Sequence, residues 1–399
     1  MIKLKVIIIG GGASGMVCAI KLARRGIDVE ILEKNNSVLK KVLITGNGKC
    51  NYFNSDMNIN HYRSNNVNFL NNTLTKNNIN NVHSFFNSIG VVPKIKNGYY
   101  YPYSNTSTTI KNLLLLECNK LNVKINTDIY VSDIIKKEKF ILKTNHNDIV
   151  CDKVVISTGS IASIKDEYNS YKILEKLGHT IIKPLPALVM LEGFDNYYKD
   201  WAGIRIEACI SLYENEKYID KQMGELQLTN FGVSGICVMN LSGRANRIID
   251  SGNIASLKIN FIPDIDNGYK YLEERSKSLP NLTIIEMLES IINYKLLYVL
   301  LKKCRINDKL TWNELNNNQK RLLIDNLFNF EFRIKNSKGF ESAQVVSGGV
   351  SLEEVNDNFE SKILNGLYII GELLDVDGDC GGYNLGFAWL SGMIVGDNL

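Results

Sequence analysis

The stretch VIIIGGGASGMVCAIKLARRGIDVEILE, residues 6–33, decides the fold of this chain. It opens with an apolar run typical of a buried strand and leads directly into GGGASG (10–15). A helical pattern then continues to Gly26, and a second β-branched run closes on Glu33. This order of strand, glycine turn, helix, strand and acid matches the G-x-G-x-x-G dinucleotide-binding unit.

Each part of this unit has an expected task. Gly10 permits the tight turn, Gly12 lets the backbone approach a pyrophosphate, and Gly15 lets the helix pack closely on the strand. The helix N-terminus points free N–H groups at the phosphates. Glu33 is expected to accept hydrogen bonds from the ribose hydroxyls. The sequence therefore predicts that the chain binds a dinucleotide.

The length and composition of the chain limit its possible domain number, binding partners and cellular compartment. The chain has 399 residues, of which 45% are hydrophobic and 22% charged, so two or three globular domains are expected. A net charge of +4 permits nucleic acid binding but does not favour it. No run is long enough for a membrane span or a signal peptide. Eight scattered cysteines and four dispersed histidines argue against metal sites and disulfides, which favours the cytoplasm.

The pattern after the fingerprint continues the nucleotide-binding domain to about residue 188. Residues 34–60 are interpreted as a long loop over the cofactor, followed by a helix over 106–120. Short strand-like runs occupy 123–151, and 154–159 is a further apolar strand ending in glycine. A strand, helix, small meander and returning strand are the layout of glutathione-reductase-like FAD domains.

The middle of the chain has a different character. Strict alternation at 204–210 and 257–261 predicts strands with one wet face, as in an antiparallel sheet or barrel. Residues 269–328 have a helical pattern, and strands with glycine turns return at 342–350 and 366–372. The expected domains are a discontinuous FAD-binding domain (1–188 and 339–399), a β-barrel-like insertion (189–264) and a helical subdomain (265–338).

A second glycine-rich turn, GDCGGYNL (378–385), opens the last predicted helix. It would place Glu372 near the ribityl chain and a positive helix end behind the edge of the flavin where negative charge gathers on reduction. This favours FAD over NAD as the bound cofactor. No second G-x-G-x-x-G occurs, so NAD(P)H is expected only as a transient electron donor, unless another reductant serves.

The whole chain resembles the BaiN/RdsA family of FAD-dependent oxidoreductases, also called aminoacetone-oxidase-like flavoproteins. The resemblance rests on GGGASG (10–15), KKVLITGNGKCNYFN (40–54), YYYPYS (99–104), PALVML (186–191), GELQLTNFGVSGICVMNLS (224–242), VVSGGV (345–350) and ESKILNGLYIIGELLDVDGDCGGYNLGFAWLSG (360–392). It implies an FAD Rossmann-type domain interrupted by a β-barrel-like domain and a helical one. It also implies that the flavin lies between residues 41–51 and 371–385, covered by the inserted domains.

The resemblance and the two glycine turns together give the candidate cofactor-binding residues. They are Gly10, Gly12, Ala13, Ser14, Gly15, Glu33, Lys34, Lys41, Thr45, Gly46, Gly48, Asn51, Val131, Thr158, Gly159, Gly371, Glu372, Asp375, Gly382, Tyr383, Asn384 and Leu385. The chain departs from the usual family pattern at several positions, which puts transfer of a specific substrate in doubt: Asn47, Lys49, Asn230, Ile236, Cys380 and Gly386.

Few residues stand out for catalysis beyond the flavin itself. Cys50 and Tyr383 lie in the two expected cofactor loops and are the candidates to donate or accept one proton. For both, plain packing is the competing interpretation. His179 follows a predicted helix and is interpreted as a helix-end residue rather than a base.

The resemblance implies activities that include reduction of a C=C bond conjugated to a ketone, and amine oxidation. The leading hypothesis is hydride transfer from reduced flavin N5 to a small conjugated C=C or enone substrate. A flavin oxidase acting on a small amine, a flavoprotein acting on tRNA, and a redox-sensing protein without catalysis remain open alternatives. The sequence does not identify the substrate, the electron donor or the oligomeric state.

Overall fold

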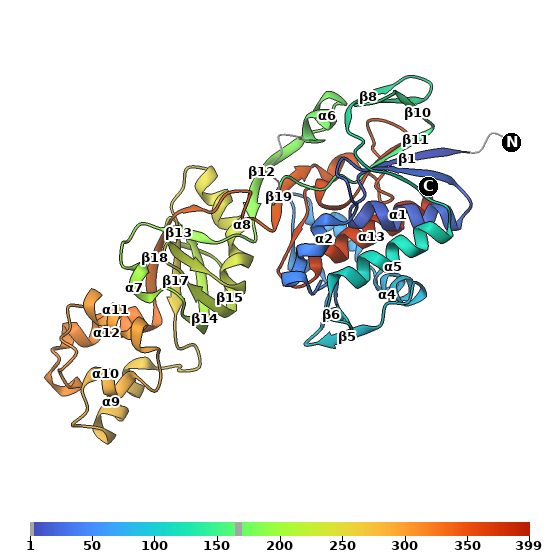
Figure 1. Ribbon diagram of the computed structural model, residues 1–399. Coiled ribbons are helices and arrows are strands. Elements are labelled where there is room, and N and C mark those ends of the chain that lie inside the picture. Colours follow the sequence, from blue (N-terminus) through green and yellow to red (C-terminus); the bar gives the residue numbers. More distant parts are fainter. Residues whose placement is uncertain (1–3, 164–169) are drawn as a thin grey trace. The chain divides into compact units, whose positions relative to one another are not determined.

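The computed structural model describes residues 4–163 and 170–399. These residues form two compact units (Figure 1). The first unit is discontinuous and comprises Met1–Pro184 and Val345–Leu399, and the second comprises Leu185–Gln344. The second unit is therefore an insertion into the first, with boundaries a few residues from those expected at 188 and 339.

A five-stranded parallel sheet forms the centre of the first unit. Its strand order is β20-β11-β1-β2-β7, so the fingerprint strand β1 lies in the middle. Four consecutive residues of β1 are buried, as expected for a parallel strand covered on both faces. The bounds are β1 Lys5–Ile9, β2 Asp28–Leu32, β7 Lys124–Asn126, β11 Lys153–Ile156 and β20 Leu367–Ile369.

The first and last long helices of this unit pack side by side, although they come from opposite ends of the sequence (Figure 1). They are α1 (Ala13–Arg24) and α13 (Tyr383–Asn398). A Cβ atom at Gly392 would lie 2.3 Å from the carbonyl oxygen of Ser14, so only glycine permits this approach. Lys21 and Asp397 form an ion pair of 2.6 Å at the other end of the helices.

Two parts of the first unit differ from the sequence-based expectation. Residues 34–60 are not one continuous loop, because they contain the short helix α2 and strand β3. The helix α4 was not predicted, since its Asn-rich sequence buries only Val82, Phe85 and Phe86 on one face. The remaining elements of this unit are α2 Lys40–Ile44, β3 Phe53–Asn54, β4 Tyr62–Arg63, α3 Leu70–Thr73, α4 Lys76–Ser88, β5 Pro93–Lys96, β6 Tyr99–Pro102, α5 Ser107–Lys120, β8 Val131–Lys136, β9 Phe140–Thr144, β10 Ile149–Cys151, α6 Ser170–Lys176, β19 Val345–Val350 and β21 Asp377–Gly378; β12, Ile181–Ala187, pairs with β19 and leads into the second unit.

The second unit contains a closed antiparallel barrel. Its strand order is β13-β16-β15-β14-β17-β18, and β18 pairs again with β13 to close the ring. The alternating sequence of β14 puts its apolar residues inside, which is the pattern expected from residues 204–210. The barrel strands are β13 Leu191–Gly193, β14 Arg205–Glu214, β15 Lys217–Leu228, β16 Gly232–Ser234, β17 Ala255–Asn260 and β18 Phe330–Ser337.

The helices of the second unit follow the expected segment only in part. Residues 265–338 were assigned to a helical subdomain, but their last part is β18, which alternates in burial and completes the barrel. The helix α8 was not predicted, and it packs on β14 and β15. The helices are α7 Tyr198–Trp201, α8 Ile236–Asp250, α9 Gly268–Ser278, α10 Ile284–Leu288, α11 Tyr294–Lys303 and α12 Asn317–Phe328. Within residues 4–163 and 170–399, no helix combines the length and apolar sequence needed to cross a bilayer.

Candidate flavin site

A cavity of about 660 Å³ lies in the first unit where β1, β2 and β11 end. Ligands of open α/β sheets bind at such carboxyl ends of parallel strands. The predicted residues among its lining are Gly10, Gly12, Glu33, Lys34, Lys41, Val131, Thr158 and Gly159. The lining also includes residues that were not predicted, among them Gly11, Asn35, Ser37, Ser157, Ser160 and Tyr171.

The glycines of the fingerprint have three different environments. Gly10 has a φ of +105°, and a Cβ there would lie 2.6 Å from the carbonyl oxygen of Ser157. A Cβ at Gly15 would lie 2.2 Å from the carbonyl oxygen of Gly10, so this position fixes the approach of α1 to β1. Gly12 is open, with its nearest neighbour at 3.8 Å. It also provides no side-chain cap to α1, so the first helical turn keeps amide groups for an anion.

Glu33 lies at the end of β2 and is 7% exposed. One carboxylate oxygen accepts a hydrogen bond from the Gly11 amide at 2.8 Å. The other accepts from the backbone amide and the side-chain amide of Asn35, at 2.8 and 2.6 Å. A carboxylate has about four acceptor positions, so Glu33 keeps capacity for a further donor such as a ribose hydroxyl.

The two glycine-rich segments predicted from the sequence meet in the structure. A Cβ at Gly371 would lie 2.6 Å from the hydroxyl oxygen of Ser14. The next residue, Glu372, pairs with Lys41 at 2.8 Å and accepts a hydrogen bond from Ser160 at 2.7 Å. Thus both carboxylate oxygens of Glu372 hold residues of the cavity wall, and residues 371–372 support that wall from behind.

A second set of predicted residues does not line this cavity. Within it, Gly382 adopts a φ of +92°, and a Cβ there would lie 2.9 Å from the side-chain oxygen of Asn51. Asn384 holds its own loop together through hydrogen bonds with Gly378. Asp375 accepts a hydrogen bond from the amide of Asn65 at 2.8 Å. The set comprises Ala13, Ser14, Gly15, Thr45, Gly46, Gly48, Asn51, Gly371, Glu372, Asp375, Gly382, Tyr383, Asn384 and Leu385.

Two buried polar atoms suit a bound cofactor. The hydroxyl oxygen of Thr158 and the side-chain oxygen of Asn51 have no hydrogen-bond partner among the described residues. An unsatisfied buried polar atom is costly unless a ligand or water completes it. Thr158 lines the cavity, and Asn51 adjoins Gly382 in the second glycine turn. Together with the open glycine cradle, these atoms fit a dinucleotide such as FAD.

The two candidates for proton transfer lie in the second set. Cys50 is fully buried, and burial raises the pKa of its thiol to about 11 although Thr45 opposes the shift. The thiol is therefore protonated at neutral pH and is poorly suited to act as a base. Tyr383 is the first residue of α13, and its ring stacks on His61 with 4.3 Å between centroids. Burial, and then the charges of Asp56 and Asp379, raise the pKa of Tyr383.

His179 lies after α6, as expected for a helix-end residue. It is 4% exposed, and its two ring nitrogens lie 3.0 Å from Glu354 Oε2 and 3.0 Å from Ser361 Oγ. Burial lowers the pKa of His179, although Glu354 opposes the shift. These contacts give His179 a structural role in joining α6 to the segment after β19.

The lowered pKa of His179 predicts a pH dependence of stability. Because the unfolded histidine titrates near pH 6.5, the unfolded chain binds more protons than the folded chain below that pH. This contribution is therefore complete above pH 6.5 and is lost as the pH falls. We expect the unfolding free energy to fall more steeply between pH 7.5 and 5 in the wild type than in His179→Gln. Urea denaturation at each pH measures the slope, and His146→Gln, at an exposed position, should keep the wild-type slope.

The fold and the cavity define a dinucleotide-binding protein of the glutathione-reductase-like fold class. The chain belongs to the family described as HI0933-like protein Rossmann domain, whose model matches residues 4–398. This confirms the family and fold class indicated by the sequence motifs.

Three relatives match nearly the full length. The 3-dehydro-bile acid delta(4,6)-reductase of Clostridium scindens is 33% identical over 98% of this chain and 97% of its own. Ribosomal RNA dihydrouridine synthases of Haemophilus influenzae and Escherichia coli are each 27% identical, covering 96% and 100% of this chain and 96% and 98% of their own. The crystal structure of 3-ketosteroid delta1-dehydrogenase from Sterolibacterium denitrificans covers 98% of both chains, with a TM-score of 0.51 at 11% identity, which shows a shared fold.

Proposed function

We propose that this chain reduces a C=C bond conjugated to a carbonyl group in a small molecule, with FAD as the bound cofactor. The observation that carries this proposal is the 33% identity, over nearly the entire chain, to a reductase of dehydro-bile acids. The relatives named as dihydrouridine synthases support the same bond class. Dihydrouridine differs from uridine by two hydrogens across a C=C bond that is conjugated to a ring carbonyl.

The residues of the cavity would hold the cofactor as follows. The first turn of α1 after Gly12 would bind the pyrophosphate, and Glu33 would accept from a ribose hydroxyl. Thr158 would donate its unsatisfied hydroxyl to the cofactor or to a bridging water. The segments at Asn51 and Gly382, which adjoin each other, would contact the flavin end. When bound and reduced by an electron donor, the flavin would supply a hydride to the electron-poor carbon of the conjugated bond.

The protein's own contribution to such a reduction is position, polarity and one proton. Hydride addition leaves an enolate, which must be protonated to give the saturated ketone. Tyr383 is our candidate for this proton, because its hydroxyl is protonated at neutral pH and it opens α13 directly after Gly382, in the proposed flavin segment. Cys50, also protonated, is the alternative. NAD(P)H is proposed as a transient donor of electrons to the flavin. The scattered spacing of the eight cysteines, with no C-x-x-C, supports our proposal of a cytoplasmic location.

The first experiment is anaerobic reduction of the purified protein. We expect stoichiometric bound flavin, bleaching by NADPH or NADH, and recovery of the oxidised spectrum on adding a 3-oxo-4-ene bile acid, with the saturated ketone as product. Rapid reoxidation by oxygen with release of peroxide would instead identify an oxidase. A protein that neither contains nor takes up FAD would refute the proposal.

Reduction of uridine in RNA is a second candidate, favoured by the two synthase relatives. The inserted unit does not supply a net positive charge for RNA, because residues 185–344 contain 20 Lys and Arg and 20 Asp and Glu. The first unit, residues 1–184 and 345–399, contains 26 Lys and Arg and 22 Asp and Glu, so the net charge of +4 lies on that unit. Salt-sensitive binding of ribosomal RNA, with dihydrouridine formed in vitro, would favour this candidate over the small molecule.

A further inference from the structure

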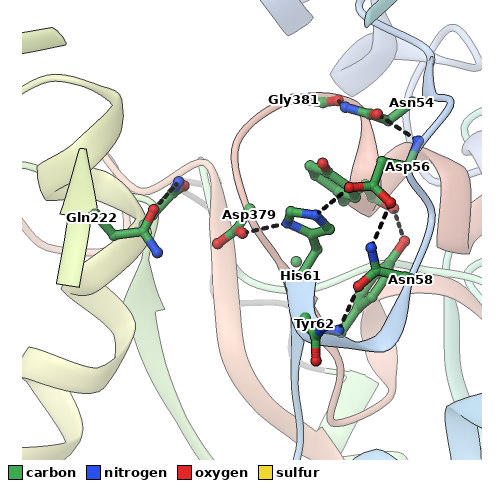
Figure 2. A network of polar contacts seen from close by, with 12 residues as sticks. Asn54, Asp56, Asn58, His61, Tyr62, Gln222, Asp379 and Gly381 are labelled. Atoms are coloured by element: carbon green, nitrogen blue, oxygen red, sulfur yellow. Dashed lines mark hydrogen bonds and ion pairs between the residues drawn. The ribbon is translucent and has the colours of Figure 1, made fainter. Parts of the chain in front are cut away.

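A polar network joins the segment after β3 to the loop that opens α13 (Figure 2). His61 lies at its centre, with Nε2 3.1 Å from Asp56 and Nδ1 2.9 Å from Asp379. Arg63 pairs with the other oxygen of Asp379 at 2.5 Å. The carbonyl of His61 accepts from the Asp379 amide and from Arg63, both at 2.9 Å, which fixes the backbone beneath the imidazole.

Exposure falls steadily along this network. The side chain of Asp56 is 64% exposed, that of His61 is 27% exposed, and that of Asp379 is 9% exposed. Hydrogen bonds from His61 and then from Asn58 lower the pKa of Asp56, so this carboxylate is ionised at neutral pH. The network therefore begins at a charged acceptor in water and ends at a buried carboxylate in the proposed flavin loop.

The geometry at His61 requires a shared proton. A neutral imidazole has one N–H donor and one bare nitrogen, so it cannot donate to two carboxylates at once. Both nitrogens face carboxylate oxygens, so either His61 carries two protons or one of the aspartic acids is protonated. In each case the three groups hold two protons, one in each of the two hydrogen bonds.

Two polar atoms at the buried end of the network can still form hydrogen bonds. Oδ1 of Asp379 is buried and accepts no hydrogen bond from the described part of the chain, although it is ion-paired with Arg63. Nε of Arg63 is likewise buried without a hydrogen-bond partner among the described residues. The ring of His61 lies against that of Tyr383, at an interplanar angle of 21°. The buried end thus adjoins the residue that is our candidate proton donor.

We propose that Asp56, His61 and Asp379 form the path by which the proton consumed in the reduction passes from solvent to the flavin loop. A proton taken from water by Asp56 passes to a bare Nε2 of His61 while the Nδ1 proton passes to Asp379, which hands it on. Exchange of the ring between its two N–H tautomers then restores Nδ1–H. One proton enters and one leaves, while the hydride and its two electrons come from the reduced cofactor. This inference rests on the proposed function. The three residues do not touch the substrate themselves, and they deliver the proton to the group that protonates it, for which Tyr383 is our candidate.

The charged and titratable groups around His61 come from three segments. They are Asp56 from its own segment, Arg63 and Tyr62 from β4, and Asp379, Cys380 and Tyr383 from the loop and start of α13. Two carboxylates face one arginine and the imidazole, so the network is neutral when His61 holds both protons. His61→Gln keeps a polar side chain between the two carboxylates, but it removes the group that carries the proton from one to the other.

The first test needs no turnover. In protein labelled with ¹⁵N at the histidine rings, with His61→Gln assigning the signal, we expect a hydrogen-bonded proton at each ring nitrogen of His61, whether the nitrogen or the carboxyl group carries it. Asp379→Asn should change the signal of Nδ1, because an amide replaces the carboxylate there. A ring nitrogen without a hydrogen bond in the wild type, or an Nδ1 signal unchanged by Asp379→Asn, would overturn the proposal whether or not the enzyme reduces enones.

The second test uses the flavin-loaded enzyme with NADPH and a 3-oxo-4-ene bile acid. We expect His61→Gln to lower kcat roughly 10- to 100-fold, within or below the usual contribution of a proton-transfer residue, with little change in KM or flavin content. Added imidazole should restore part of the rate, which a purely structural loss would not allow. His146→Gln is the matched control. A wild-type kcat in His61→Gln would refute the path, whereas a wild-type protein inactive with enones would refute the proposed function and leave the NMR result to decide.

Discussion

Gly15→Ala is expected to abolish stoichiometric flavin binding and to lower the melting temperature of the first unit. Its Cβ would lie 2.2 Å from the carbonyl oxygen of Gly10 and 2.5 Å from the hydroxyl of Ser157. Both atoms belong to the turns that form the cavity, so α1 has to move away from the ends of β1 and β11. Overpacking of this kind costs about 1–3 kcal/mol or more. Flavin content per polypeptide and thermal unfolding measure the two effects.

Gly12→Ala separates cofactor contact from packing. The nearest atom to its Cβ would be the Ser157 carbonyl oxygen at 3.8 Å, which is an ordinary contact. We expect the flavin-free protein to keep its stability within about 0.5 kcal/mol. FAD affinity should nevertheless fall at least about 10-fold, because the methyl group occupies the space through which the pyrophosphate reaches the backbone.

A third glycine variant provides the baseline for this pair. Gly339→Ala lies in open space and should resemble the wild type in both measurements. If Gly12→Ala bound FAD like the wild type, the pyrophosphate would have to lie elsewhere. If Gly15→Ala kept both its flavin and its melting temperature, α1 would be free to shift. That result would contradict the close contact of α1 with α13 at Ser14 and Gly392.

The features that the sequence predicted correctly are those carried by short, local patterns. The strand, turn and helix of residues 6–33 follow from an apolar run, spaced glycines and one helical stripe, and β1, α1 and β2 have nearly those bounds. The barrel strand β14 follows from strict alternation over a few residues. Such patterns act within one element, so no knowledge of distant neighbours is needed.

The features that the sequence could not predict depend on distant partners. Lys41 and Glu372 are 331 residues apart, and nothing local indicates that they pair. The same holds for His61 and Asp379, which only the pairing of β4 with β21 brings together. The strand β18 follows directly after helical sequence, so its place in the barrel is visible only once β13 and β17 are known.

Trp389→Ala is expected to be strongly destabilising and to release the flavin. Trp389 is fully buried in α13, and its indole N–H donates to the carbonyl of Tyr52 at 2.8 Å. Its ring also packs edge-on against Phe86 of α4, with 5.2 Å between centroids. Truncating a buried tryptophan costs about 3–5 kcal/mol, a large part of the stability of a typical domain. The affected contacts tie the start of β3 to α13.

The loss should extend to cofactor binding because of what these two segments carry. Asn51 precedes Tyr52 directly, and Gly382 and Tyr383 open the helix that contains Trp389. Loosening this contact therefore separates the two proposed flavin segments. Trp389→Phe, which keeps part of the ring volume but leaves the Tyr52 carbonyl without its indole donor, should lose about 1–3 kcal/mol and retain some flavin.

Tryptophan fluorescence follows the first unit only while Trp389 is present, so flavin content and circular dichroism measure the loss in Trp389→Ala. Of the three tryptophans, Trp201 and Trp312 belong to the inserted unit, so Trp389 alone reports on the first. Trp312 is 1% exposed and donates to Glu273 at 2.9 Å, which makes Trp312→Ala a matched truncation in the other unit. We expect Trp312→Ala to unfold at lower urea while keeping the flavin-binding stoichiometry of the first unit. If Trp312→Ala released the flavin and Trp389→Ala did not, the cofactor would depend on the inserted unit rather than on the contact between α13 and Tyr52.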